Sequence, residues 1–244
     1  LIQGNVKVYA STDPDYIPED HPIAMVDIKD LKMTIITTDP TRRYYYTLLF
    51  GDKYRVKIAT RNVNIPGIQN FRDLGGYPSY AHKKRTRWGM IYRSAEIDSL
   101  IRCARMELKH IGIKTIIDLR AASEVGTQTP LKDEFKVVHI PISTGDMENI
   151  LKGIREEKIK SDTVYRMVER MNRELIDNYT AEFRQVFDVL LDQNNYPVVI
   201  HCSSGKGRTG VVSALVLAAL GVNEDIIMED YRLSNDYFNI PAAS

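Results

Sequence analysis

The chain has 244 residues, enough for one large domain or two modest ones. Hydrophobic residues make up 43% and charged residues 27%, which indicates a folded globular protein and excludes a disordered, collagen-like or coiled-coil chain. The net charge of +1 gives no reason to expect a nucleic-acid partner. The longest apolar stretch, Val211 to Val222, is too short to span a bilayer, so no transmembrane segment is predicted.

Residues 1–64 are predicted to form a small all-β sandwich that acts as an accessory domain. Strands are expected at Val6–Ala10, Ala24–Ile28, Met33–Thr37, Tyr44–Phe50 and Tyr54–Ala59. The last two of these flank Gly51-Asp52, which is typical of a hairpin. Short strands separated by turn residues, without a helical period, favour a sandwich.

After Pro66-Gly67 the pattern changes to strands that alternate with helices. Strands are expected at residues 114–119, 136–142 and 197–201. Helices are expected at residues 98–110, 147–160, 162–193 and 208–220, and after Asn223, a good N-cap. The alternation predicts an α/β domain over residues 65–244, with a central parallel sheet flanked by helices.

The segment between the last predicted strand and the next helix carries the strongest chemical signal. It reads His201-Cys202-Ser203-Ser204-Gly205-Lys206-Gly207-Arg208-Thr209-Gly210. A loop there directs backbone N–H groups into a concavity at the positive end of a helix dipole, which suits a tetrahedral dianion. Gly205 and Gly207 let the backbone curl around the anion, and Arg208 can clamp two phosphate oxygens. The same positive environment favours a Cys202 thiolate that attacks phosphorus.

This loop resembles the Cys-x5-Arg signature of protein tyrosine phosphatases, including the preceding His and the following Thr-Gly. The resemblance implies that Cys202 is the nucleophile and forms a phosphocysteine, and that Arg208 binds phosphate and stabilises the transition state. It also implies that Thr209 hydrogen-bonds the leaving thiolate and that His201 helps to hold the thiolate and the loop. The other residues expected to bind substrate in the loop are Ser203, Ser204, Gly205, Lys206 and Gly207.

Further segments resemble bacterial members of that family, which include secreted lipid and tyrosine phosphatases of intracellular pathogens. The segments are Asn70–Tyr77 (NFRDLGGY), Arg87–Ser94, Ile117–Arg120 with Glu124, and Asp230-Tyr231 with Ser234-Asn235. Family members usually continue with further C-terminal helices, and this chain begins without Met, so we expect both ends to be truncated. A β-domain on a bacterial phosphatase suggests an exported protein that is periplasmic, lipid-anchored or secreted.

The general acid is predicted from a departure in the motif. The pathogen relatives place an Asp immediately before the loop Arg, where this chain has Gly207. The loop therefore resembles the broader tyrosine and phosphoinositide phosphatases, whose acid comes from a separate loop after an earlier strand. The nearest equivalent is Asp146, which follows the strand predicted at residues 136–142. The alternatives are Asp73, Asp118 and Glu124, and a structural role is favoured for the two aspartates.

The expected substrate is a phosphorylated protein, with phosphotyrosine and dual-specificity activity first. Lys206 adds a cation beside the phosphate and favours multiply anionic ligands, so phosphoinositides and inositol polyphosphates are the alternative. The string Asn70-Phe71-Arg72 also resembles a segment of tyrosine-phosphatase-like phytases. Arg72 itself is open between a phosphate contact and a buried salt bridge. The N-terminal domain has three candidate roles: binding an unknown partner, positioning the catalytic domain on a surface, or stabilising it.

Several competing interpretations are weaker. The glycines at 205, 207 and 210 formally match a dinucleotide fingerprint, but no further strand with a ribose-binding acid follows. Arg208 argues against Cys202 as an ordinary buried thiol, whereas Cys103 fits a packing role in a helix. The histidines lack metal-ligand spacing, so neither a metal nor a cofactor is predicted. The rival functions are a phosphate-binding pseudophosphatase, a sulfurtransferase and an arsenate reductase.

Overall fold

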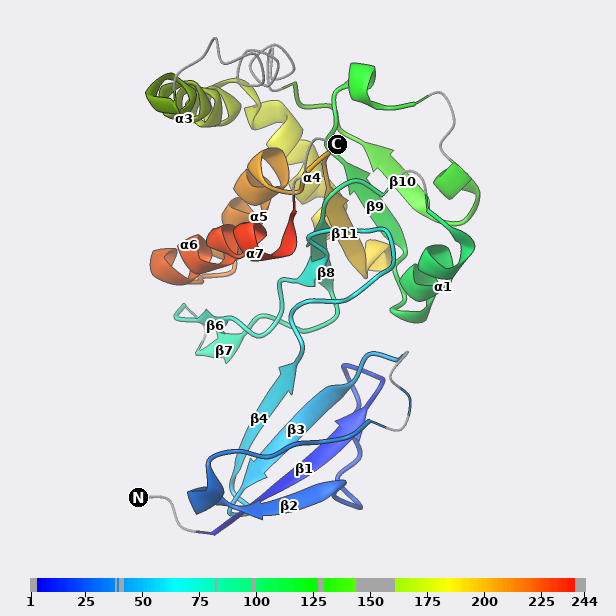
Figure 1. The fold of residues 1–244 in the computed structure, drawn as a ribbon, viewed down its shortest axis with the longest axis vertical. Helices are drawn as coiled ribbons and strands as arrows, with labels where there is room; N and C mark the ends of the chain where they lie inside the picture. The colour runs from blue at the N-terminus through cyan, green and yellow to red at the C-terminus, as the bar shows by residue number, and fades with distance from the viewer. Residues whose placement is uncertain are drawn as a thin grey trace.

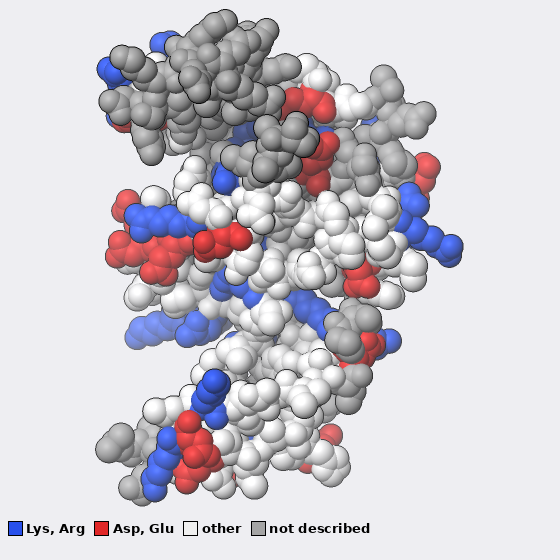
Figure 2. All heavy atoms as spheres, viewed as in Figure 1, with Lys and Arg blue, Asp and Glu red and all other residues white. Residues whose placement is uncertain are grey.

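The computed structural model describes residues 4–37, 39, 42–81, 83–97, 100–126, 130–143 and 161–239. These residues form an N-terminal antiparallel sheet and a larger α/β part (Figure 1). Figure 2 shows basic and acidic side chains interspersed on the face viewed there, as the small net charge leads one to expect. None of the helices in the described ranges has both the length and the hydropathy that a membrane span requires.

The N-terminal sheet has the strand order β2-β1-β3-β4, and each neighbouring pair is antiparallel. Its strands are β1 (Asn5–Ser11), β2 (Ala24–Asp27), β3 (Tyr45–Phe50) and β4 (Tyr54–Ala59). Along β3 buried residues alternate with partly exposed ones, because successive side chains point to opposite faces. Gly51 and Asp52, between β3 and β4, have φ angles of 52° and 56°, and the predicted hairpin is confirmed.

Two predictions for the N-terminal segment are not met. A sandwich packs two sheets face to face, whereas the described residues of this segment form one four-stranded sheet, so the sandwich is not confirmed. The strand predicted at Met33–Thr37 is wrong, since these residues form neither strand nor helix and follow a short 3-10 helix, η1 (Ile28–Asp30). Ile36 is 90% exposed, so this run of β-formers has no packed surface to favour a strand.

The second sheet has the order β10-β9-β11-β8-β5. The strands β8 (Ile91–Ser94), β9 (Thr115–Asp118), β10 (Lys136–His139) and β11 (Val198–His201) run parallel, and β5 (Arg72–Asp73) pairs antiparallel with β8. Every residue of β9 and β11 is buried, as in parallel strands covered on both faces. The predicted parallel α/β sheet is therefore confirmed.

Helices cover both faces of this sheet (Figure 1). They are α1 (Arg102–His110), α3 (Ser161–Asn178), α4 (Thr180–Leu191), α5 (Gly207–Ala219), α6 (Glu224–Arg232) and α7 (Ser234–Tyr237). Ile200 of β11 packs in one hydrophobic cluster with Val186 of α4 and Val212 of α5. Its neighbour Val199 packs on the other face, in a cluster with Leu108 of α1. One central strand thus contributes to two cores, because its side chains alternate between faces.

The helices differ from the sequence prediction in their bounds, since the helix predicted at residues 98–110 is α1 (Arg102–His110), and in one division. The helix predicted over residues 162–193 is two helices, separated at Tyr179, whose φ of −116° and ψ of 28° are not helical. The helix predicted at residues 147–160 lies outside the described residues. Asn223 caps α6 as predicted, and its side chain accepts a hydrogen bond from the Asp225 N–H at 2.8 Å. The remaining short elements are β6 (Pro78–Ser79), β7 (Lys84–Arg85), η2 (Ala122–Glu124), η3 (Pro130–Asp133) and η4 (Gln193–Asn195).

A buried ion pair joins the N-terminal sheet to the α/β part. Arg43, which precedes β3, pairs with Asp73 of β5 at 2.8 Å, and their side chains are 6% and 0% exposed. Arg43 also donates hydrogen bonds to the hydroxyl groups of Tyr45 at 3.0 Å and Tyr92 at 2.7 Å. The N-terminal sheet is therefore fixed to the sheet that carries the cysteine loop.

Candidate active site

The loop that is predicted to bind phosphate connects the C-terminal end of β11 to α5, which begins at Gly207. In open parallel sheets ligands bind at this edge, and the first turn of a helix offers N–H groups that lack intrahelical partners. Gly205 has a φ of +67°, and a Cβ atom there would lie 2.4 Å from the Ser94 carbonyl oxygen. Only glycine fits this position, because the loop packs directly against the end of β8.

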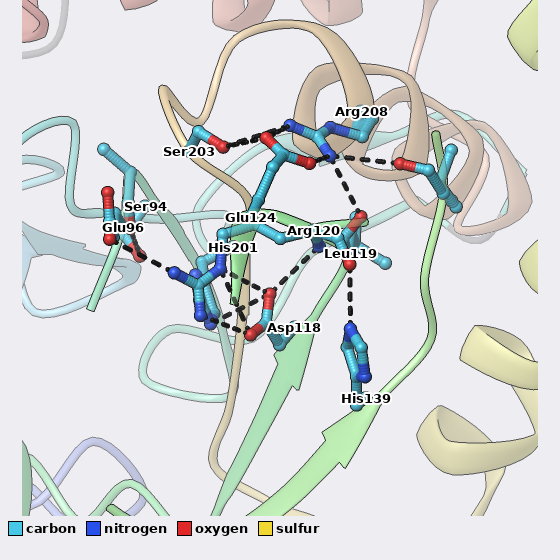
Figure 3. Close-up of polar contacts among 12 residues, drawn as sticks. Ser94, Glu96, Asp118, Leu119, Arg120, Glu124, His139, His201, Ser203 and Arg208 are labelled. Carbon is cyan, nitrogen blue, oxygen red and sulfur yellow. Dashed lines mark hydrogen bonds and ion pairs between the residues drawn. The ribbon is translucent and has the colours of Figure 1, made fainter. Parts of the chain in front are cut away.

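Arg208, in the first turn of α5, has its guanidinium held by Glu124 (Figure 3). Its Nη2 donates to Glu124 Oε1 at 2.8 Å and to the Ser203 hydroxyl at 3.1 Å. Its Nη1 donates to Glu124 Oε2 and to the Ile142 carbonyl oxygen, the latter at 3.0 Å. Two parallel bonds to one carboxylate fix the plane of the guanidinium. The Arg208 fork is therefore oriented by the protein itself.

Contacts within the site keep both Glu124 and Arg208 in their charged forms. Burial alone would raise the pKa of Glu124, but hydrogen bonds from Arg208, Ser203 and the Ala121 N–H outweigh it and lower the pKa to about 2. Burial alone would lower the pKa of Arg208, but its contacts with Glu124 and Cys202 outweigh that effect and raise the pKa. Glu124 is therefore a carboxylate, and Arg208 a cation, at neutral pH.

Cys202, the predicted nucleophile, is 1% exposed. The Cys202 side chain is one of the groups that raise the pKa of Arg208. The structure therefore brings these two predicted residues together. The Thr209 hydroxyl is buried and has no hydrogen-bond partner among the described residues. A buried hydroxyl without a partner is costly, and the Thr209 hydroxyl is therefore a free donor for an anionic sulfur.

A second group of buried charges lies beside the loop, around Asp118 at the end of β9 (Figure 3). Arg120 donates to both oxygens of Asp118, with Nη2 at 2.6 Å from Oδ2, and to Glu96 at 3.2 Å. His201 Nε2 lies 3.6 Å from Asp118 Oδ1. Burial would raise the pKa of Asp118, but the bond from Arg120 and the nearby His201 lower it overall. Asp118 therefore serves as the ion-pair partner of Arg120.

The other predicted loop residues have distinct surroundings. The Ser203 hydroxyl donates to Glu124 Oε1 at 2.6 Å, and the Ser204 hydroxyl accepts from the Lys206 N–H at 3.4 Å. Lys206 Nζ lies 5.1 Å from the centroid of the Phe238 ring, a cation–π distance. The chain that follows α7 therefore borders the loop on the side of Lys206.

Two residues singled out in the sequence, Arg72 and Asp73, have their contacts away from the loop. Arg72 has no exposed surface, and its Nη2 donates to the Asp230 carbonyl oxygen at 2.8 Å and to the Ser234 hydroxyl at 3.0 Å. The structure therefore gives Arg72 the buried salt bridge that was the alternative to a phosphate contact. Asp73 is likewise fully buried and accepts two backbone N–H hydrogen bonds. Asp146 lies outside the described residues.

The structure also shows contacts that the sequence did not predict. The sequence identifies Glu124 only as a candidate acid, whereas its carboxylate holds Arg208. Asn70 and Arg93 lie in segments that resemble the family but carry no predicted role, and they donate hydrogen bonds to carbonyl groups of the loop. These partners are separated from the loop residues that they contact by 79 to 135 positions, so no local sequence pattern predicts the contacts.

Several known proteins are similar to this chain. Triple specificity protein phosphatase PtpB of Mycobacterium tuberculosis is 30% identical over 195 residues, which cover 70% of this chain and 68% of that protein. The Cupriavidus necator protein H16_A0669 is 30% identical over 172 residues, 69% of this chain and 61% of that protein. A solved structure of the core catalytic domain of PP-IP phosphatase SIW14 from S. cerevisiae covers 75% of this chain and 82% of its own, with 19% identity and a TM-score of 0.44. Residues 63–243 match the model of the tyrosine phosphatase family, and the chain belongs to that family.

Proposed function

We propose that this chain hydrolyses phosphomonoesters through a Cys202 phosphocysteine intermediate, with phosphotyrosine and other phosphorylated protein side chains as substrates. The observation that carries the proposal is Arg208, a cation in the first turn of α5 that Glu124 orients beside the Cys202 thiol. A relative with 30% identity is described as a triple specificity protein phosphatase, which supports a substrate range wider than phosphotyrosine. Phosphoinositides and inositol polyphosphates are the alternative substrates.

The proposed reaction has two steps. The Cys202 sulfur attacks phosphorus, the S–P bond forms, and the P–O bond to the leaving group breaks as Asp146 gives a proton to the leaving oxygen. Arg208 and the loop N–H groups stabilise the charge on the three equatorial oxygens. Water then attacks phosphorus and gives a proton to Asp146. The S–P bond breaks, and the returning thiolate accepts a hydrogen bond from the Thr209 hydroxyl.

Asp146 is proposed as the acid on its position and by elimination. The Ile142 carbonyl oxygen accepts a hydrogen bond from Arg208 at 3.0 Å, so the chain passes the guanidinium four residues before Asp146. Four extended residues span at most about 14 Å, so a carboxyl group at position 146 is within reach of a leaving group bound at this loop. The alternative acids are each held in a buried or ion-paired setting: Asp73, Asp118 and Glu124.

Stabilisation of the catalytic part is the role that we propose for residues 1–64. The buried pair of Arg43 and Asp73 supports it, because the pair crosses from the N-terminal sheet to β5. The family match begins at residue 63, which supports a boundary near residue 64. The sandwich form of this domain stays a prediction.

The activity is tested by phosphate release, without added metal, from a phosphotyrosine peptide, a phosphoserine peptide, a phosphoinositide and inositol hexakisphosphate. We expect release by the wild type and its loss in Cys202→Ser, because a serine hydroxyl at neutral pH is a far weaker nucleophile than a thiolate. Quenched wild-type reactions are expected to contain a phosphocysteine. Release that persists in Cys202→Ser contradicts the mechanism, and no release of any of the four by the wild type contradicts the activity.

A further inference from the structure

Two buried side chains hold the carbonyl groups at the centre of the catalytic loop. Asn70 Nδ2 donates hydrogen bonds to the carbonyl oxygens of Ser204 and Gly205, at 3.2 and 3.1 Å. Arg93 Nη2 donates to the same Gly205 carbonyl oxygen at 2.8 Å. Asn70 and Arg93 are 2% and 0% exposed, so water does not compete for these bonds. The mechanism above gives neither residue a role.

These bonds fix the direction of two consecutive peptide units. In a trans peptide the C=O and N–H groups lie in one plane and point in opposite directions. Because the carbonyls of Ser204 and Gly205 point toward Asn70, the N–H groups of Gly205 and Lys206 point away from it. The Lys206 N–H has the Ser204 hydroxyl at 3.4 Å, which is long for a hydrogen bond and leaves it a donor for an anion.

Gly205 is the residue at which this orientation is easiest to lose. It has a φ of +67°, and glycine can rotate its adjoining peptide units at little steric cost. If the peptide between Gly205 and Lys206 turned over, a carbonyl oxygen would take the place of the N–H and repel the phosphate oxygens. The two donors on the Gly205 carbonyl oppose that rotation.

Asn70 is itself held in one orientation. Its φ of +57° lies in the left-handed region, which asparagine tolerates better than most residues. Arg72 Nη1 donates to Asn70 Oδ1, so Nδ2 is the end of the amide that faces the loop. Arg72 is held by Asp230 and Ser234, and Asp230 Oδ2 also pairs with Arg93 at 2.7 Å. Both holders of the loop therefore belong to one buried cluster.

The cluster is also positively charged. It contains the two guanidinium groups of Arg72 and Arg93 and the single carboxylate of Asp230. Burial and the neighbouring Arg93 lower the pKa of Arg72 to about 10, which leaves it charged at neutral pH. An excess of positive charge behind an anion-binding loop favours the bound dianion.

We propose that Asn70 is a positioning residue of the phosphatase reaction, which sets the two central peptide units of the loop so that their N–H groups face the substrate phosphate. Arg93 is the second holder of the Gly205 carbonyl. The inference rests on the proposed function and deepens it, because it assigns a role to the Asn70–Tyr77 segment. Asn70 acts through the backbone of the loop and does not touch the reacting atoms.

The test compares Asn70→Asp and Asn70→Gly with a matched control, Asn195→Asp. A carboxylate at position 70 keeps the acceptor for Arg72 but offers no donor to the two carbonyls, and glycine removes the amide without adding charge or straining the backbone. Asn195 is also buried, donates to the Val189 carbonyl oxygen at 2.7 Å, and accepts from Lys136 Nζ at 2.7 Å. It precedes β11 and so lies at the opposite end of that strand from the loop.

We expect both Asn70 variants to lose about 100-fold in kcat, as removal of one preorganised donor does. We expect inorganic phosphate to inhibit them at least about tenfold more weakly, and Asn195→Asp to match the wild type in both measurements. Normal kcat and phosphate inhibition in folded Asn70→Gly would overturn the proposal. If only Asn70→Asp were impaired, added charge would be the cause, and the proposal would fail.

Two controls keep the result decisive. Circular dichroism and thermal unfolding show whether each variant is folded at the assay temperature. If both Asn70 variants are unfolded, Arg93→Lys is assayed instead. Lysine keeps the positive charge beside Asp230 but is too short to reach the Gly205 carbonyl oxygen. A normal kcat of Arg93→Lys would overturn the proposal. A wild type that releases no phosphate from any of the four substrates would refute the proposed function, whereas an active wild type with unaffected variants refutes this inference alone.

Discussion

The guanidinium of Arg208 accounts for much of what the site can do. Glu124 accepts from both of its terminal nitrogens, and the Ile142 carbonyl and Ser203 hydroxyl add further contacts. A planar fork that is already held loses little conformational freedom when it binds a phosphate. Its charge then acts from a fixed position, which is the condition under which electrostatic stabilisation of a transition state is most effective.

Replacing Glu124 by glutamine is expected to lower kcat/KM by about tenfold to a hundredfold, because the Arg208 fork loses one of its two carboxylate contacts and its fixed plane. The Glu124 side chain is 33% exposed, so solvent screens part of the lost charge pair and the melting temperature at neutral pH should fall only modestly. Steady-state kinetics and thermal unfolding of the same preparation measure both quantities. An unchanged kcat/KM, or a loss explained by unfolding, would contradict this role for Glu124.

The same carboxyl group predicts a dependence of stability on pH. In the folded protein its pKa is about 2, below the ordinary 4.5, so the unfolded chain binds the proton more readily. Its contribution to stability is therefore complete above pH 4.5 and is lost as the pH falls toward 2. Urea unfolding of the wild type and Glu124→Gln at several pH values measures it. The stability difference between them should shrink over this range, and a constant difference would show that Glu124 does not titrate as described.

At the scale of elements, the sequence predicted those whose signals are local. The apolar run at the start of β11 and the Asn223 cap of α6 needed only neighbouring residues to be recognised. Met33–Thr37 is also rich in residues that favour strands, but it forms no strand. A strand also needs a neighbouring strand to pair with and a packed face, and both come from distant residues. The break at Tyr179 carries neither glycine nor proline, so an amphipathic pattern alone runs through it.

The candidate site likewise contains some contacts that the local sequence predicts and others that only the fold shows. Cys202 and Arg208 are six positions apart on one loop, so their juxtaposition follows from the sequence alone. Glu124 reaches Arg208 across 84 residues, and Arg93 reaches Gly205 across 112. Both contacts arise from the strand order of the sheet, which places β8 and β9 on either side of β11. A resemblance can flag such residues, but only the fold shows what they touch.

At the scale of the whole molecule, the N-terminal sheet and the α/β part share buried polar groups. Arg43 forms an ion pair with Asp73, whose side chain has no exposed surface. Arg61 adds hydrogen bonds to the carbonyl oxygens of Asp73 and Gly75, at 2.7 and 2.8 Å, and stacks 3.7 Å from the centroid of the Tyr77 ring. Removing the N-terminal residues would therefore leave polar groups of the catalytic part buried without partners.

Arg43→Met is expected to lower the free energy of unfolding by about 3–5 kcal/mol, because it leaves the carboxylate of Asp73 buried without its cation. Neither side chain contacts the catalytic loop among the described contacts, so kcat per folded molecule should equal that of the wild type. Urea unfolding and phosphate release at a temperature where the variant is folded measure the two effects. The double variant Arg43→Met/Asp73→Asn should lose less stability than the sum of the single variants, since the second change removes the stranded charge. Additive losses would show that the ion pair does not join the two parts, and a fall in kcat would show that the N-terminal sheet acts on catalysis as well as on stability.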